Sequence, residues 1–290
     1  MFTKIFILYI YLQALLCGCA PDRWRSDFVR LRKDFKVSIE RIARLDPRIS
    51  ESSGLAHGPG GTIWTHADGG PLNELYLTNL QGELLQTVPL NIPNHDWEDL
   101  AQDEQGNLFI GDFGNNTNTR QNLQVHKVQP ENRTVTETMK FRYGDQTDYN
   151  PPLLRRHHDM EAFLYHADSL YLFTKSWALW PASKLYTLPA ASGDYTLYPR
   201  EELRLQSAVT AADIAPSAQQ FALLGYGRLY LFQPPANNPA VTFNGTRYCL
   251  PVGRTGQAEG ILYLSQNRLL ISNENGKLFL VTLQPKDSRK

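Results

Sequence analysis

The chain has 290 residues, of which 42% are hydrophobic and 20% are charged, and this composition predicts a globular protein with a core of its own. Lys plus Arg and Asp plus Glu each total 29, so the formal net charge is zero. Proteins that bind nucleic acid usually carry a basic excess, so the charge balance argues against a nucleic-acid partner.

The first 19 residues have the pattern of an export signal. Lys4 gives a positive start, and residues 5–16 (IFILYIYLQALL) form an apolar core that is too short to span a bilayer. Residues 16–19 (LCGC) resemble the bacterial lipobox, whose final cysteine is acylated. The resemblance implies a signal peptide at residues 1–18 and lipid (palmitate) on Cys19. The residue that follows is not Asp, which implies an outer-membrane lipoprotein of the cell envelope facing the periplasm or the outside. A plain signal peptide with two incidental cysteines is the alternative.

The three cysteines fit this interpretation. Cys17 would leave with the signal and Cys19 would carry lipid, so Cys249 would remain alone without an intrachain disulfide. Cys249 lies in a run of alternating apolar residues, and we expect it to be a buried structural residue.

Residues 19–34 are predicted to form a lipidated tether. Residues 21–33 are polar and basic with scattered aromatic residues, which fits a solvated linker or a short helix. Residues 35–45 then alternate apolar and polar side chains, as one β-strand does. We expect a single domain over residues 35–284 and a polar tail at residues 285–290.

Residues 96–116 (DWEDLAQDEQGNLFIGDFGNN) predict a β-hairpin with acids at one edge. Two short apolar runs flank a Gly-containing turn, as in a pair of antiparallel strands. The start of the first strand and the end of the second lie at the same edge of such a pair. The acids stand at these positions: Asp96, Glu98 and Asp99 at the start, and Asp112 at the end.

The hairpin pattern recurs along the chain. The repeats are 45, 63, 51 and 47 residues apart. Strand repeats with a period of about 40–50 residues predict the blades of a β-propeller, which is an all-β fold. We expect five blades, and six remain open if residues 145–156 or the N-terminus contain a degenerate unit. The leading residues of the repeats are Ser53, Glu98, Glu161, Ala212 and Glu259.

The last repeat lacks one strand, because only residues 277–283 follow its hairpin. The strand at residues 35–45 is one in excess. We therefore expect the N-terminal strand to join the last blade and close the ring, which pairs two edges that would otherwise be open.

A closed propeller would bring the acids to one end of its central channel, which we call the mouth. Clustered carboxylates repel one another unless a cation or protons compensate, and calcium prefers such oxygen ligands. As the alternative, these acids accept hydrogen bonds from backbone amides or pair with cations, and so join neighbouring blades. The predicted metal ligands are Asp96, Glu98, Asp112, Glu161 and Glu259, with Asp99, Asp159, Asp213 and Glu51 nearby. The predicted ligand-binding residues are Asp68, Asp112, Lys175, Tyr226 and Glu274.

Other chemistries have weaker patterns. Glu98 and Glu161 are candidates for a catalytic carboxylate pair that acts as general acid and base. The motifs of a nucleophile elbow, a P-loop and a dinucleotide-binding loop are absent from the sequence. Trp177, Trp180 and the tyrosines of residues 195–198 either stack on a ligand or pack between blades. Five histidines near strand ends raise the possibility of zinc, but the absence of a fixed ligand spacing favours ordinary loop residues: His57, His66, His95, His157 and His158.

Four motifs follow one another in order between residues 51 and 283. They are DWEDLA…GDFGNN…R (96–120), DMEAF…LYLFTK (159–175), AVTAADIAP (208–216) and QAEGI (257–261). Together they resemble bacterial secreted propellers similar to the SdiA-regulated and phytase-esterase-like families. The resemblance implies an exported propeller with an acidic mouth and calcium as its cofactor. Ser53 and Ala212 depart from the acidic position of the repeat. Phosphate-ester hydrolysis, a fold-level analogy, would need basic residues near the mouth, for which the candidates are Lys175, Arg120, Arg155 and Arg156.

Two functions are therefore expected. The first is a monomeric lipoprotein that uses its acidic mouth, with calcium, to bind a small molecule or a protein partner. The second is a calcium-dependent phosphoester or ester hydrolase that uses Glu98, Glu161 and Asp112 as metal ligands. Stabilisation by calcium without turnover would favour the first, and turnover that a chelator abolishes would favour the second.

Overall fold

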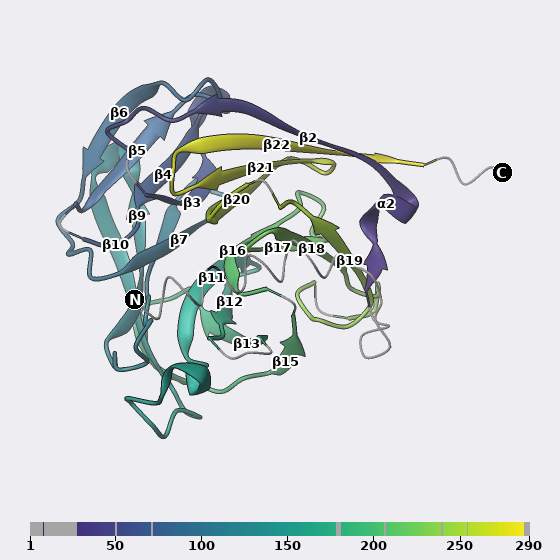
Figure 1. Cartoon of the computed structure of the whole chain (residues 1–290). Helices are drawn as coiled ribbons and strands as arrows, with labels where there is room; N and C mark the ends of the chain where they lie inside the picture. Colours follow the sequence, from purple (N-terminus) through teal and green to yellow (C-terminus); the bar gives the residue numbers. More distant parts are fainter. Residues whose placement is uncertain are drawn as a thin grey trace.

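The strands of the protein form five sheets around one axis (Figure 1). The computed structural model describes residue 8 and residues 28–49, 51–70, 72–177, 181–205, 207–238, 240–253 and 255–286. The innermost strand of each sheet contacts the innermost strand of the next, and the fifth contacts the first. This closed ring makes the protein a five-bladed β-propeller, as the repeats predict. The inner strands are β3 (Ser52–His57), β7 (Trp97–Gln102), β11 (Asp159–His166), β16 (Val209–Ile214) and β20 (Ala258–Ser265).

The remaining strands complete the blades outward from the axis. The first blade adds β4 (Ile63–Ala67), β5 (Glu74–Thr78) and β6 (Leu84–Pro89). The second adds β8 (Leu108–Asp112), β9 (Leu123–Gln129), β10 (Thr134–Tyr143) and β14 (Gly193–Leu197). The third adds β12 (Ser169–Lys175), β13 (Ala182–Pro189) and β15 (Glu201–Arg204). The fourth adds β17 (Phe221–Gly225), β18 (Arg228–Gln233), β19 (Thr246–Pro251) and β1 (Val29–Arg30). The fifth adds β21 (Arg268–Asn273), β22 (Lys277–Pro285) and β2 (Phe35–Arg44).

The helices are short. Within residues 28–286, leaving out the positions that the structure does not describe, they are α2 (Leu31–Asp34) and the 3₁₀ turns Pro59–Gly61, Pro130–Asn132 and Leu153–Arg155. No helix among the described residues is long and apolar enough to cross a membrane.

The N-terminal strand closes the ring, as expected. β2 runs antiparallel to β22, from the pair Phe35 and Pro285 to the pair Arg44 and Lys277. Figure 1 shows the purple β2 beside the yellow β22. Strands from the two ends of the chain thus share one blade, so opening the propeller requires breaking a whole strand pair.

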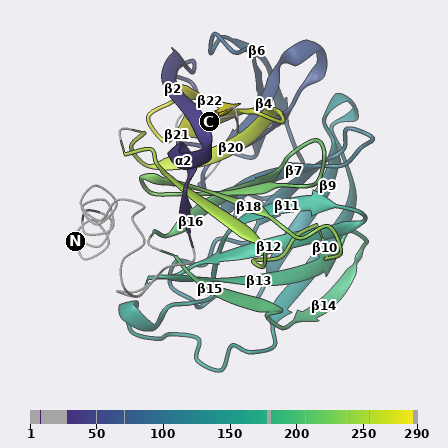
Figure 2. The same cartoon turned by 90° about the vertical axis from the view of Figure 1, so that its right-hand side faces the viewer.

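Two strands belong to blades in which the sequence does not predict them. β14 belongs to the connection within the third blade, but it pairs in parallel with β10 of the second blade. Tyr195, one of the tyrosines of residues 195–198, lies in this strand, which runs beside β10 in Figure 2. β1 pairs in parallel with β19, and Leu31, the first residue of α2, is fully buried. Part of the expected tether therefore folds onto the propeller.

The core consists of apolar layers between neighbouring blades. Side chains alternate along each strand, so both faces of a blade pack against its neighbours. Each of the five blade interfaces described contains its own cluster of buried apolar residues. A smaller cluster of Trp177, Ala208 and Tyr226 lies near the mouth between the third and fourth blades.

The predicted signal peptide and Cys19 lie outside the described residues, apart from Leu8. Cys249 is 3% exposed, as expected for a structural residue, but it is disulfide-bonded. The expectation that it has no disulfide partner is therefore wrong. The other two cysteines of the chain, Cys17 and Cys19, both lie outside the described residues.

Candidate metal and ligand site at the propeller mouth

The mouth is the end of the axis at which the inner strands begin. In each inner hairpin the start of the first strand pairs with the end of the second, as Trp97 pairs with Asp112 and Asp159 with Lys175. Antiparallel pairing therefore places the residues that precede each inner strand beside those that follow the second strand. The sequence predicts this convergence, and the structure has it.

A β-bulge interrupts every inner hairpin near the mouth. A bulged residue has no cross-strand partner, so the bulge turns its side chain away from the regular alternation. Glu98, Glu161 and Glu259 occupy the bulges of three blades. In the fourth blade the bulge contains Thr210, whose hydroxyl donates a hydrogen bond of 2.6 Å to the carbonyl of Ala258. The expectation that Ala212 leads this repeat is therefore wrong by two residues.

Three carboxylates meet at the mouth between the first and second blades. Asp68 follows β4, Asp96 precedes β7, and Glu98 lies in the bulge of β7. One oxygen atom from each lies within 4.8 Å of the other two. Among the described residues no side chain or backbone group donates a hydrogen bond to these three carboxylates. Their negative charge is therefore not compensated by a direct partner.

Gly114 provides the room for these carboxylates. A Cβ atom at this position would clash with Glu98 Oε1 and Asp96 Oδ2. The backbone nitrogen of Gly114 donates a hydrogen bond of 3.1 Å to the carbonyl of Asp96, so the loop after β8 is fixed at this distance. The absence of a side chain at Gly114 is therefore part of the geometry of the acid cluster.

Lys175 contributes a positive charge to the mouth that acts on Asp68, Asp96 and Glu98. Its Nζ is 2.9 Å from Glu161 Oε1 and lies over the rings of Trp177 and Tyr226, 5.1 and 5.5 Å from their centroids. Burial alone would lower the pKa of Lys175, but Glu161 and the other anions around it raise that pKa well above its usual value. Lys175 is therefore a fixed cation that is paired with Glu161.

The acids at the mouth hold protons more tightly than ordinary carboxyls. Burial, and then the charge of Asp96, raises the pKa of Asp68 to about 7. Burial, and then Asp159, raises the pKa of Asp96 to about 6. Burial, and then Glu161, raises the pKa of Glu98 well above its usual value. Protons stabilise this cluster when no cation is bound, which means that a bound cation would displace them.

Glu259, Glu274 and Glu51 extend the acidic surface toward the fifth blade. The hydroxyl of Tyr226 donates a hydrogen bond of 2.8 Å to Glu259, and burial raises the pKa of Glu259 to about 8. Gln257 donates a hydrogen bond of 2.7 Å to Glu274. Burial, and then the charge of Glu51, raises the pKa of Glu274. The structure thus brings these acids to the mouth, but it gives Glu259 and Glu274 partners within the protein.

Asp112 is also near the mouth and is saturated with hydrogen bonds. Its carboxylate accepts hydrogen bonds from His95 at 2.7 Å, from Arg120 at 3.0 Å and from Gln124 at 3.0 Å. Burial alone would raise its pKa, but these donors lower it. It also accepts the backbone N–H of Asp96 at 3.1 Å. Asp112 therefore positions the strand end that carries Asp96, and we do not retain it as a metal ligand.

Asp159 has a similar positioning role. It accepts hydrogen bonds from the indole of Trp177 at 2.7 Å and from the backbone N–H of Asn115 at 2.8 Å. It therefore joins the loop of the second blade to the third, as the alternative interpretation of the acids predicts.

Two predicted acids do not point to the mouth. Asp99 accepts hydrogen bonds from backbone N–H groups of three blades, at Leu100, Phe163 and Ala212, over 2.9 to 3.2 Å. Asp213 lies toward the far end of β16 and accepts the backbone N–H groups of Ile214 and Tyr263. Both residues join blades, which again matches the alternative interpretation.

The histidines do not form a metal site. His95 and His158 pair with Asp112 and Asp145, and His157 pairs with the hydroxyl of Ser176. His57 and His66 make hydrogen bonds of 3.0 and 2.9 Å with backbone carbonyls. Among the described residues the one group with the geometry to hold a metal contains only carboxylates. The structure therefore gives no support to a zinc site.

No protein-family model matches the chain, and no curated protein matches it in sequence. Three solved structures are similar in fold. Virginiamycin B lyase from Staphylococcus aureus with quinupristin is 12% identical with a TM-score of 0.42, over 82% of this chain and 68% of the other. PQQ-bound aldose sugar dehydrogenase from Streptomyces coelicolor is 10% identical with a TM-score of 0.47, over 86% of this chain and 99% of the other. The Cps50 (Swd1) β-propeller domain from Myceliophteria thermophila is 11% identical with a TM-score of 0.43, over 84% of this chain and 99% of the other. These values are too low to carry any argument about function, so the argument rests on the site itself.

Proposed function

We propose that the protein is an exported, lipid-anchored β-propeller that binds calcium at its mouth and uses the bound ion to hold an oxygen-bearing ligand or partner. The observation that carries the proposal is the cluster of Asp68, Asp96 and Glu98, whose oxygens lie within 4.8 Å of one another. Calcium lies about 2.3–2.6 Å from each of its oxygen ligands, so two oxygens bound to one ion are at most about 5 Å apart.

The predicted ligand set becomes narrower in this proposal. Asp96 and Glu98 stay, and Asp68 joins them from the predicted ligand-binding residues. Glu161, Glu259 and Asp112 leave, because Lys175, Tyr226 and His95 with Arg120 already engage them. Lys175 and Arg120 then supply positive charge beside the ion, which suits a ligand that carries a carboxylate or a phosphate.

A calcium titration tests this proposal. Protein purified with a chelator is titrated with calcium and, separately, magnesium while the melting temperature is followed. A bound ion stabilises the folded state by about 2.7 kcal/mol at 100 times its Kd. We expect calcium to raise the melting temperature of the wild type and of Glu131→Gln, whose side chain is exposed and far from the mouth, but not that of Asp68→Asn with Glu98→Gln. Equal responses from all three proteins would overturn the site.

The alternative, a calcium-dependent hydrolase like the phytase-esterase-like propellers, is favoured by one observation. Burial keeps the pKa of Glu98 well above the usual value, whereas Glu161 is ion-paired with Lys175. A carboxyl group that is protonated near neutral pH can act as a general acid beside a metal. Hydrolysis of p-nitrophenyl phosphate or p-nitrophenyl acetate, lost with chelator and in Glu98→Gln, would support the enzyme over the binding protein.

Export and anchoring rest on the sequence of residues 1–19 alone, and they require Cys249 to be without its disulfide in the mature protein, because Cys17 and Cys19 are the other cysteines of the chain. Mass spectrometry of the N-terminus of protein made in a bacterial host would test them. We expect a mature chain that begins at an acylated Cys19, and an unmodified or uncleaved N-terminus would contradict this.

A further inference from the structure

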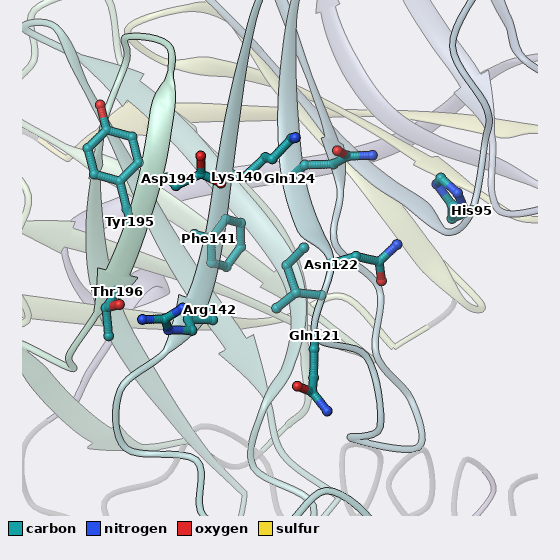
Figure 3. Close-up of a pocket in the computed structure, with 11 residues that line it drawn as sticks. His95, Gln121, Asn122, Gln124, Lys140, Phe141, Arg142, Asp194, Tyr195 and Thr196 are labelled. Carbon is teal, nitrogen blue, oxygen red and sulfur yellow. The ribbon is translucent and has the colours of Figure 1, made fainter.

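A cavity lies on the outer strands of the second blade (Figure 3). It has a volume of about 540 Å³, which is within the usual range of about 300–1,000 Å³ for small-molecule sites. Its lining comes from the loop before β7, from the start of β9 and from β10 and β14. The lining residues include His95, Gln121, Asn122, Gln124, Lys140, Arg142, Asp194 and Thr196.

The strand register defines the floor of this groove. Gln124, Lys140 and Asp194 face one another across β9, β10 and β14, and Arg142 pairs with Thr196 in the next row. Residues two apart on a strand point to the same face, so Lys140 and Arg142 stand side by side at a spacing of about 7 Å. Figure 3 shows both side chains on β10, with Gln121 and Asn122 on the neighbouring segment. The additional parallel strand β14 provides one side of the floor.

The charges of the groove are not balanced within the protein. Lys140 and Arg142 are exposed, and the part of the chain that the structure describes gives neither of them an ion-pair partner. Asp194 lies opposite Lys140 but makes no ion pair with it. The groove therefore offers two uncompensated cations against one carboxylate, whereas the mouth offers an excess of carboxylates. The groove therefore fits an anionic ligand without a metal ion, whereas the mouth would need a bound ion to do so.

The amides of the groove indicate what else the ligand carries. The amides of Gln121 and Asn122 have donors and an acceptor that match hydroxyl groups, which also donate and accept. One N–H of Gln124 donates to Asp112, which leaves its other N–H and its oxygen for a ligand. The apolar and aromatic lining residues are Leu123, Phe141 and Tyr195, but Leu123 and Phe141 are buried in the core between the second and third blades and Tyr195 packs against that core. A hydroxyl-rich anion suits such a surface better than a lipid or an apolar peptide.

We propose that this groove binds an acidic oligosaccharide, with Lys140 and Arg142 pairing to its carboxylates and the amides of Gln121, Asn122 and Gln124 bonding to its hydroxyls. The residues of this site are not those of the acid cluster of Asp68, Asp96 and Glu98, although His95 and Gln124 reach Asp112 beside that cluster.

Isothermal titration with tetragalacturonate tests the proposal, and neutral maltotetraose is the matched ligand. All titrations contain a chelator, so their outcome does not depend on calcium at the mouth. We expect tetragalacturonate to bind the wild type with an affinity that falls as salt rises, because exposed charges are screened. We expect maltotetraose to bind at least about tenfold more weakly, which corresponds to about 1.4 kcal/mol.

Three variants locate the binding. Lys140→Ala with Arg142→Ala should weaken tetragalacturonate at least about tenfold, corresponding to about 1.4 kcal/mol. Lys36→Ala with Arg41→Ala removes the same charge from exposed positions of β2 and should leave the affinity unchanged. Gln121→Ala with Asn122→Ala keeps the charge and should also weaken binding.

The proposal is overturned by any of three results. The first is that the wild type does not bind tetragalacturonate at millimolar concentration. The second is that Lys140→Ala with Arg142→Ala and Lys36→Ala with Arg41→Ala lose the same affinity. The third is that Gln121→Ala with Asn122→Ala keeps full affinity, because the site would then recognise only the charge of the ligand. Unchanged melting temperatures of the variants, whose substituted side chains are all exposed, show that losses of affinity are not losses of folding.

Discussion

Glu98 and Asp99 are neighbours on β7, and both are buried acids, but their surroundings differ completely. The carboxylate of Asp99 accepts three backbone N–H groups, one from its own blade and two from the third and fourth blades. The carboxylate of Glu98 accepts none among the described residues, and it faces Asp68 and Asp96 instead. The β-bulge between Trp97 and Leu100 is what lets adjacent residues point to different surroundings.

The comparison separates two uses of a buried acid. An acid that backbone donors surround stabilises the fold, because its removal leaves those donors without partners. An acid that lies among other acids destabilises the empty protein and gains a partner only when a cation or a proton arrives. The same residue type in the same strand can therefore belong to the architecture or to the site, and the donors around it decide which.

The largest expected effect comes from replacing each acid by its amide in chelator. Asp99→Asn leaves at least one buried N–H group without an acceptor, which costs about 1–3 kcal/mol. Glu98→Gln removes a charge from a repulsive cluster, so we expect its free energy of unfolding to equal or exceed that of the wild type. Urea denaturation measures both. A larger loss for Glu98→Gln than for Asp99→Asn would reverse the assignment of the two residues.

The blades and their closure were predictable, because turn residues and apolar alternation are local properties. The period of the hairpins gave five blades, and the missing strand of the last repeat matched the extra strand at residues 35–45. β14 was not predictable, because nothing in the sequence Gly193–Leu197 says that it pairs with the preceding blade. The register of the fourth blade was also predicted wrongly. Ala212 and Asp213 match the sequence repeat better than Thr210 does, but the β-bulge places Thr210 at the position that Glu98 has in the second blade.

The site was predictable as a region but not as a set of ligands. The convergence of acids follows from antiparallel hairpins around an axis. Which acids remain without donors depends on backbone groups far away in sequence, such as the N–H groups of Phe163 and Ala212 that reach Asp99. The motif GDFGNN contained a usable signal, because a glycine between acidic strands indicates a close approach. Gly114 makes that approach to Glu98 and Asp96.

A smaller effect is expected in the dependence of stability on pH. The pKa of Asp68 rises from 3.8 to about 7 and that of Asp96 to about 6, with burial as the main cause in both. Between pH values of about 4 and about 7 the folded protein therefore binds more protons than the unfolded chain, and its free energy of unfolding falls as pH rises. We expect the melting temperature in chelator to fall through this window, and Glu259, with its pKa of about 8, to extend the fall above it.

Asp68→Asn should make that fall shallower, because one of the titrating groups is gone, while Glu131→Gln should keep it. Saturating calcium should also flatten the profile, since the ion replaces the protons. Parallel profiles for the wild type and Asp68→Asn would mean that other groups, such as Asp213 with its pKa of about 7, cause the dependence.

Gly114→Ala is expected to have the smallest effect on stability and the clearest effect on the affinity for calcium. The new Cβ would clash with Glu98 Oε1 and Asp96 Oδ2, so the carboxylates must move apart and the affinity for calcium should fall by about tenfold, or about 1.4 kcal/mol. Gly106→Ala is the matched control, because Gly106 has a φ of +85° and no atom lies within 4 Å of its added Cβ. That variant should lose about 1 kcal/mol of stability through backbone strain and keep its calcium affinity. Calorimetric titration beside thermal melting separates the two, and a Gly114→Ala protein with full affinity would show that calcium does not sit between these carboxylates.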